Sequence, residues 1–309
     1  MSTDASAAAQ PQTAPTCYRH PDRETYIRCS RCERPICPDC MVSASVGFQC
    51  PECVRQGNRE RRTARTAFGG RVSEDAGYAS KALIAVSVLA FVLQQALPGF
   101  TERLFLQGVA VADGQWFRLV SAAFLHGGLV HLLLNMLGLY LLGPSLEATM
   151  GRLRFVVLYL LAALGGSAAS YAVSGFRTAS LGASGAIFGL FAAHLVVSRK
   201  LGRDAGQLWG LLAVNVAYGF LAPNIDWRAH FGGFVAGGLT AVGLAYAPRA
   251  RRALVQAVVC LGVLLLVLAT VVVRTADLNH ASPAQVVACA PLAAIDPDRD
   301  LGGCLRDRT

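Results

Sequence analysis

Charged residues are scarce in this chain, and lysine is almost missing. Only 15% of the 309 residues are charged while 54% are hydrophobic, and lysine occurs only at positions 81 and 200. A soluble globular domain rarely has so few charges, whereas a membrane protein with several spans does. Basic residues exceed acidic ones by nine, and nearly all of them are arginines. This excess could indicate nucleic-acid binding, but the arginine positions described below favour a membrane-orientation signal.

Cysteine is absent between residues 54 and 259, while seven of the ten cysteines lie between residues 17 and 53. This contrast divides the chain into a small cysteine-rich head, residues 16–55, and a large apolar body from residue 80 onward. Residues 1–15 lack an apolar core and a basic start, so we interpret them as a disordered leader rather than a secretory signal. The polar, arginine-rich stretch 56–79 is typical of a linker.

The head contains four ligand pairs, each separated by two residues: Cys17 and His20, Cys29 and Cys32, Cys37 and Cys40, Cys50 and Cys53. Eight such ligands are the number that two tetrahedral zinc ions need. Sequential pairing would leave eight or nine residues between the halves of each site, and interleaved pairing leaves sixteen and seventeen. The longer loops favour interleaving. One ion is then held by Cys17, His20, Cys37 and Cys40, and the other by Cys29, Cys32, Cys50 and Cys53.

The alternatives for the head are a disulfide framework and an iron–sulfur site. The odd number of cysteines and the cytosolic side argued below count against disulfides, and the histidine with regular pairs suits zinc better than iron. A segment this small cannot hold a core without metal, so we expect the zinc to be structural. The head resembles cross-braced B-box and RING-like zinc fingers. We expect a cytosolic protein partner and no nucleic acid, because aromatic and basic residues are not interleaved.

The body contains seven apolar runs of spanning length, which predict an all-α membrane protein with several spans. The runs cover about 80–97, 118–142, 154–173, 182–198, 206–222, 229–247 and 253–273. Arginines cluster before the first run and in alternate loops, which places the N-terminus in the cytoplasm. The tail, residues 274–309, is then extracytoplasmic, where a disulfide between Cys289 and Cys304 would persist. Cys260 falls within the seventh run, as a small buried apolar residue.

Placing polar side chains inside membrane spans costs free energy, so each of them indicates a structural or functional role. His126, His131 and Asn135 fall in the outer half of the second run, with His131 and Asn135 four residues apart on one helix face. Ser184 and His230 fall near the outer ends of the fourth and sixth runs. Three helices therefore place polar groups in one layer.

Small residues flank these polar groups and predict close helix contact. Gly185 and Gly189 share a face of the fourth run, and Gly233 and Gly237 share a face of the sixth, in register with His230. Packing these faces together would bring the Ser184 hydroxyl within about 3 Å of the His230 ring, as nucleophilic catalysis requires.

These motifs resemble the rhomboid family of intramembrane serine proteases. The resemblance rests on Gly182-Ala-Ser184-Gly185, on His230-x2-Gly233-x3-Gly237, on His131-x3-Asn135 and on Trp116-x-Arg118, and it covers residues 80–247. It implies a six-helix core, to which residues 248–273 add a seventh helix. Ser184 matches the nucleophile, and His230 matches the general base. His131, Asn135 and the Ser184 backbone N–H match the oxyanion-stabilising positions, and His126 matches a structural one.

One residue departs from the family. Phe188 stands where the family often has a tyrosine beneath the histidine, so it keeps the ring and lacks the hydroxyl. Zinc-finger heads occur on rhomboid-like proteins of actinobacteria, so the resemblance implies a bacterial plasma-membrane protein. The implied substrates are transmembrane helices that enter from the lipid bilayer and are cut near their extracytoplasmic end. The implied chemistry needs no catalytic cofactor.

Three other functions fit the sequence less well. A transporter would show inverted repeats, and the chain has no internal repeat. A zinc metalloprotease would need an H-E-x2-H motif, which the chain lacks. A catalytically weak rhomboid-like protein that only binds transmembrane clients would usually have lost its serine or histidine, and this chain keeps both.

Overall fold

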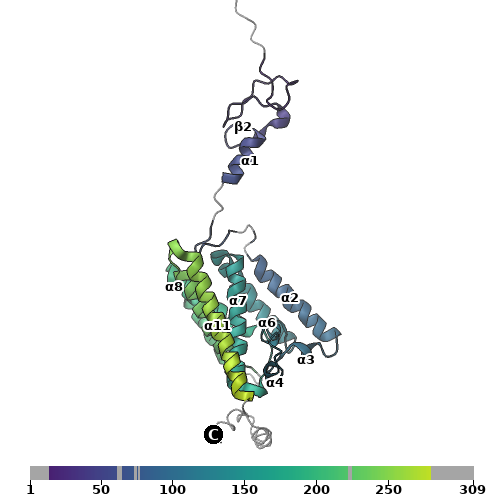
Figure 1. Cartoon of the computed structure of the whole chain (residues 1–309), viewed down its shortest axis with the longest axis vertical. Helices are drawn as coiled ribbons and strands as arrows, with labels where there is room; N and C mark the ends of the chain where they lie inside the picture. The colour runs from purple at the N-terminus through teal and green to yellow at the C-terminus, as the bar shows by residue number, and fades with distance from the viewer. Residues whose placement is uncertain (1–13, 61–64, 73–74, 76, 222–224, 280–309) are drawn as a thin grey trace, which may run out of the picture. The chain divides into compact units, whose positions relative to one another are not determined.

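Long apolar helices make up more than half of the described residues, as a computed structural model shows (Figure 1). The structure describes residues 14–60, 65–72, 75, 77–221 and 225–279. The chain divides into two units, residues 1–63 and residues 64–309, which contain the head and the body respectively. The predicted cysteine pair of the tail, Cys289 and Cys304, lies outside the described residues.

The head has little regular structure and a core made of its ligands. Its elements are η1 (Pro38–Cys40), β1 (Val42–Ser43), β2 (Phe48–Gln49) and α1 (Pro51–Glu60), with β1 and β2 antiparallel. Six of its seven cysteines are buried, together with Ile36. The helix α1 continues through residues 56–60, the first residues of the predicted linker. Pro51 at the first helical position and Glu52 in the first turn are typical of a helix start.

Seven helices of 16 or more residues form the described part of the body. They are α2 (Tyr78–Ala96), α6 (Leu129–Met150), α7 (Arg152–Ser174), α8 (Ser184–Leu201), α9 (Gly206–Leu221), α10 (Trp227–Tyr246) and α11 (Arg252–Asn279). Five of the described helical stretches are long and apolar enough to span a membrane, and they contain α2, α6, α7, α10 and α11. The fourth and fifth predicted spans are α8 and α9, which do not meet that measure. With these helices, the body is that of an integral membrane protein.

Short elements connect the long helices near the candidate site. Between α2 and α6 lie α3 (Phe100–Leu104), β3 (Leu106–Gln107), α4 (Gly108–Ala112), α5 (Arg118–Ser121) and η2 (Ala122–Phe124). Between α7 and α8 lie η3 (Gly175–Arg177) and β4 (Ala179–Ser180), and η4 (Arg249–Arg251) precedes α11. The strands β3 and β4 pair antiparallel, with Leu106 opposite Ser180. This pairing fixes the chain just before α8.

The second predicted span begins too early. Residues 118–124 form the short elements α5 and η2, and the spanning helix α6 starts only at Leu129. Two glycines, Gly127 and Gly128, directly precede α6, and the buried Arg118 fixes α5 by donating from its guanidinium to the carbonyl oxygens of Glu102 and Phe105, each at 2.9 Å. His126 therefore lies before α6 rather than within a span. At the other end of the body, α11 continues to Asn279, beyond the predicted limit at residue 273.

Helix α8 packs against α6, α7 and α10, and the closest contacts are made by glycines. A Cβ added to Gly233 would lie 2.0 Å from the Gly185 carbonyl oxygen, and one added to Gly237 would lie 2.4 Å from the Gly189 Cα. Any side chain there would force α8 and α10 apart. The predicted contact between the two glycine faces is therefore present. In Figure 1, α2 lies beside α6 at one edge of the bundle, and α11 lies beside α7.

Hydrogen bonds to Glu147 fix the start of α2, and burial of Phe68 fixes the segment before it. The carboxylate of the buried Glu147 in α6 accepts hydrogen bonds from the Ala79 and Ser80 backbone N–H groups and from the Ser80 hydroxyl. It thereby caps a helix whose own N-cap residue has no side chain. Residues 65–71 fold onto the body, with Phe68 only 4% exposed. This part of the predicted linker is therefore packed against the helices of the body.

Candidate active site and metal-binding clusters

Ser184 is the first residue of α8, where the chain turns sharply from β4 into the helix. Gly182 makes this turn with a φ of +132°, a conformation that favours glycine. Its N–H donates to the Ala122 carbonyl oxygen at 2.9 Å. The Ser184 hydroxyl is half-buried, and the backbone N–H groups of the first turn of a helix have no partner within that helix. The serine therefore sits where a negative charge would be stabilised.

His230 lies in the first turn of α10, and Asp226 fixes that turn. The Asp226 carboxylate accepts hydrogen bonds from the Ala229 N–H and from the Ser170 hydroxyl of α7. His230 Nε2 lies 2.8 Å from Ser184 Oγ, within hydrogen-bond distance. The ring of Phe188, one helical turn after Ser184, stacks on the imidazole at a centroid distance of 4.3 Å and an interplanar angle of 9°. The imidazole is thus held by a hydrogen bond and an aromatic ring.

The sequence analysis did not identify two of these supports. Asp226 could have been found, because an aspartate directly before an apolar run is a helix-start signature. Ser170 lies 56 residues away from Asp226, and only the packing of α7 against α10 brings it near. Both side chains position the first turn of α10, and their hydrogen bonds go to that turn and to each other rather than to the His230 ring or to Ser184.

The candidate oxyanion residues lie on α6, beside the turn at Gly182. The His131 ring borders that turn so closely that a Cβ on Gly182 would lie 2.8 Å from its Nε2 and 3.8 Å from Ser184 Oγ. Asn135 is buried, and its Nδ2 donates to the His131 carbonyl oxygen at 2.9 Å. This bond uses one of its two amide hydrogens and leaves the second for another acceptor.

His126 has a structural setting. Its side chain is 1% exposed, and its ring lies edge-on to that of His131 at a centroid distance of 5.2 Å. Its backbone N–H and carbonyl are both hydrogen-bonded to the Gln94 side chain of α2. His126 therefore joins α2 to the loop that precedes α6.

A small cavity of about 20 Å³ lies next to Ser184. Its lining includes Gly166, Gly182, Gly185 and Ala229, so most of the wall is backbone or methyl groups. The volume is enough for one water molecule or a very small side chain.

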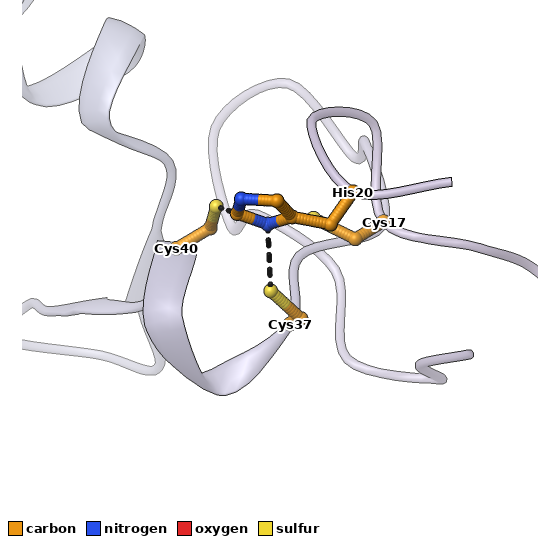
Figure 2. A group of neighbouring side chains, drawn as sticks. All are labelled: Cys17, His20, Cys37 and Cys40. Carbon is orange, nitrogen blue, oxygen red and sulfur yellow. Dashed lines mark hydrogen bonds between the residues drawn. The ribbon is translucent and has the colours of Figure 1, made fainter. Parts of the chain in front are cut away.

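The eight ligands of the head form two clusters in the interleaved order. One contains Cys17, His20, Cys37 and Cys40, and the other Cys29, Cys32, Cys50 and Cys53; the ligand atoms of each lie within 4.8 Å of one another. Figure 2 shows the first cluster, with the His20 ring between Cys37 and Cys40. His20 Nδ1 lies 3.3 Å from Cys37 Sγ and 3.4 Å from Cys40 Sγ. Ligands at ~2.0 and ~2.3 Å from a tetrahedral ion would be about 3.5 Å apart.

Local donors prepare the thiols for a metal ion. Burial acts to raise the pKa of Cys17 and of Cys29, but hydrogen bonds from backbone N–H groups outweigh it and lower both pKa values to about 6. Arg34 donates from Nε to Cys32 Sγ at 3.3 Å and lies over the Tyr18 ring at 4.3 Å. The eight described cysteines are all free thiols, Cys260 among them, and Cys260 is only half-buried.

Comparisons with known proteins agree with the geometry. The Rhomboid domain family matches residues 113–247. Rhomboid protease GluP of Bacillus subtilis is 37% identical over 172 residues, which are 52% of this chain and 34% of GluP. The Bacillus subtilis rhomboid YdcA is 35% identical over 134 residues, 42% of this chain and 67% of YdcA. RHOMBOID-like protein 5 of Arabidopsis thaliana is 37% identical over 153 residues, 47% of this chain and 49% of that protein.

The matched part thus spans about a third of GluP, about half of RHOMBOID-like protein 5 and two thirds of YdcA. It contains the turn at Ser184, the glycine contact between α8 and α10, and His230. The chain belongs to the rhomboid family.

Proposed function

We propose that this protein is an intramembrane serine endopeptidase that uses Ser184 as its nucleophile and His230 as its general base. The observation that carries the proposal is the 2.8 Å separation of His230 Nε2 and Ser184 Oγ, with Phe188 stacked on the imidazole. A serine and a histidine at this distance are the minimal pair for acyl transfer. The relatives named as rhomboid proteases support the same activity.

In the proposed reaction, His230 takes the Ser184 proton while Oγ attacks the carbonyl carbon of the scissile bond. The imidazolium then returns the proton to the leaving amine, and the C–N bond breaks to give an ester on Ser184. Water, deprotonated by His230, hydrolyses that ester and restores the hydroxyl. A carboxylate partner is not needed, because Phe188 and the capped turn at Asp226 hold the imidazole in place.

The oxyanion of the tetrahedral intermediate would be stabilised from two sides. The Ser184 backbone N–H lies at the start of α8, where the helix dipole favours negative charge. His131 and Asn135 approach from α6, and the second amide hydrogen of Asn135 can donate to the oxyanion. Such preorganised donors are the largest contribution to catalysis in many acyl-transfer enzymes.

We propose that the substrate is a transmembrane helix of another protein. A peptide bond within an intact helix is inaccessible, so the segment near the cut must unwind, which small residues permit. The cavity lined by Gly166, Gly182 and Ala229 has room for only a small side chain next to Ser184. A small residue at the cleavage position is therefore the expected preference.

We propose that each cluster of the head holds a structural zinc ion. Four closed thiolate or imidazole ligands leave no open coordination position, which is typical of structural zinc. A cytosolic protein partner would find exposed apolar side chains on the head, such as Val46, 82% exposed, and Tyr26, 78% exposed. We also propose a bacterial plasma membrane as the location, with the N-terminus in the cytoplasm, and the arginines at one end of the spans support that orientation.

The protease proposal is tested by a fluorophosphonate probe on the purified full chain, followed by cleavage of a model transmembrane substrate. Ser184→Ala should abolish labelling and cleavage, and His230→Ala should abolish cleavage. Ser198→Ala is the matched control, because Ser198 is also a buried serine of α8 and lies at its other end. Undiminished cleavage in Ser184→Ala would overturn the proposal. An unlabelled wild-type chain that still binds a transmembrane peptide would support the client-binding alternative.

A further inference from the structure

Three arginines from distant parts of the body converge on one buried turn. Arg65 belongs to the segment before α2, Arg154 to the first turn of α7, and Arg252 is the first residue of α11. Arg65 Nη1 donates to the Gly69 carbonyl oxygen at 3.1 Å. A Cβ built on Gly69 would lie 3.1 Å from Arg252 Nη1 and 3.7 Å from Arg154 Nη2. We call Arg65, Arg154 and Arg252 the arginine cluster.

The turn that gathers the cluster is firmly held. Gly69 has a φ of +86°, and the Gly70 N–H donates to Thr66 Oγ1. The buried Gln256 of α11 donates to the Phe68 and Leu244 carbonyl oxygens and accepts from Arg154 Nε at 2.8 Å. The half-buried Arg154 and Arg252 and the exposed Arg65 are therefore gathered around a turn that packing and hydrogen bonding hold in place.

The charges of the cluster have no counterion in the described part of the chain. The ion pairs formed there involve other basic residues, and no carboxylate lies within 4 Å of the three guanidinium groups. Arg65 and Arg252 both repel the charge of Arg154. The first turns of α7 and α11 also carry no acidic residue, although helix N-termini favour negative charge. Membrane orientation explains an excess of arginines at this end, but it does not explain their convergence.

We propose that the arginine cluster binds the phosphate group of an anionic membrane phospholipid. Guanidinium groups bind phosphate oxygens through paired, charge-assisted hydrogen bonds. Two helix N-termini add the partial positive charge that favours a phosphate. The cluster lies at the ends of the spanning stretches that contain α7 and α11, which is the depth of the lipid headgroups. A lipid bound there would join the segment before α2 to the ends of these two helices.

The test is a lipid titration of the purified full chain in neutral detergent, with bound lipid counted by native mass spectrometry and thermal stability recorded in parallel. Phosphatidylglycerol should bind and raise the Tm, and phosphatidylcholine should do neither. Arg252→Gln and Arg65→Gln should each weaken phosphatidylglycerol binding about tenfold. The Arg65 side chain is exposed and its one side-chain hydrogen bond goes to the Gly69 carbonyl oxygen, so the variant, which keeps the backbone bridge to Arg71, should fold normally. Arg65→Lys keeps the charge and should bind more tightly than Arg65→Gln.

The matched control is Arg203→Gln, which removes one exposed arginine outside the cluster, just after α8. It should bind phosphatidylglycerol as the wild type does. An equal loss in Arg203→Gln, or no loss in either cluster variant, would overturn the proposal. If inorganic phosphate at millimolar concentration raises the Tm as much as phosphatidylglycerol does, the site takes soluble phosphate, and the assignment to a lipid is wrong.

Discussion

The head and the body of this protein differ in the contacts that stabilise each of them. In the head, the buried residues are chiefly cysteines that converge on two points, and Ile36 is the only other apolar side chain buried there among the described residues. In the body, the tightest contacts are places where side chains are missing, such as Gly185 against Gly233. If the two clusters hold the proposed zinc ions, the head depends on metal that it must acquire, whereas the body depends on close helix contact that its own sequence provides. Metal removal should therefore disrupt only the head, and substitution of a contact glycine should disrupt only the body.

Removing the proposed zinc should have the largest effect on stability, and only the head should lose its structure. Structural zinc contributes roughly 10–16 kcal/mol in small domains, more than a segment of this size can replace with apolar burial. We expect two zinc ions per chain, one in Cys29→Ser, and loss of protease resistance of residues 14–60 after chelation. Metal analysis and limited proteolysis measure both. Probe labelling of Ser184 should be unchanged, and a parallel loss of labelling would show that the two regions are coupled.

Acid should also destabilise the head, because it protonates the cysteine thiols. Cys17 and Cys29 have pKa values of about 6 in the folded head, against an ordinary value of 9.0. Between these two values the folded state binds fewer protons than the unfolded state, so their contribution to folding is complete above pH 9 and is lost as pH falls through 6. Zinc binds the deprotonated thiols, so zinc release followed with a chromogenic chelator should increase as the pH falls. Release that does not increase with acid would contradict thiolate ligation.

Filling the glycine contact should damage the body and leave the head intact. In Gly233→Ala, the new Cβ would lie 2.0 Å from the Gly185 carbonyl oxygen, so α8 and α10 must separate. Overpacking of this kind costs roughly 1–3 kcal/mol, and the 2.8 Å distance between Ser184 and His230 would be lost with it. Cleavage should fall to background while zinc content stays the same. The control is Gly262→Ala in α11, where a Cβ meets nothing within 4 Å.

Asn135 tests the chemistry within an intact body. Loss of one oxyanion donor costs about 3 kcal/mol, or roughly a hundredfold in turnover, so Asn135→Ala should cleave slowly and unfold at nearly the wild-type temperature. Steady-state cleavage gives the first quantity and thermal unfolding in detergent the second. Turnover equal to the wild type would remove Asn135 from the mechanism. A large drop in Tm would mean that its bond to the His131 carbonyl is its main role.

The two regions also differ in how far the sequence predicts them. Loop lengths alone distinguish interleaved from sequential ligand pairs, so the grouping at Cys17 and Cys29 was predictable. The glycine spacing likewise predicts the contact that brings Ser184 to His230. Hydropathy alone did not show that the run from residue 118 breaks before α6, because residues 118–125 are apolar apart from Arg118 and Ser121; the pair Gly127-Gly128 is the sequence feature that marks the break.

Two polar side chains, the half-buried His194 and the buried Glu147, were not identified from the sequence, because their partners come from other helices. His194 of α8 lies in the half of the helix away from Ser184, and its Nε2 lies 2.8 Å from the Leu142 carbonyl oxygen of α6. Glu147 was hidden for the same reason, since its partners are backbone N–H groups of α2. Such contacts follow from helix packing, which a one-dimensional pattern does not contain.

The smallest expected effect concerns Phe188, where this chain departs from its family. The ring lies parallel to the imidazole of His230 at 4.3 Å, so the stacking surface is already present without a hydroxyl. Phe188→Tyr keeps that surface and should change turnover by less than about threefold, since aromatic pairs contribute roughly 0.5–1.5 kcal/mol through their rings. Phe188→Ala removes the surface and frees the imidazole, so it should cost about tenfold in turnover with KM little changed. Cleavage assays on both variants separate the ring from the hydroxyl. If Phe188→Tyr were several-fold faster than the wild type, the hydroxyl would have a role that stacking does not supply. If Phe188→Ala cleaved at the wild-type rate, the imidazole would be held by Ser184 and the capped turn at Asp226 alone.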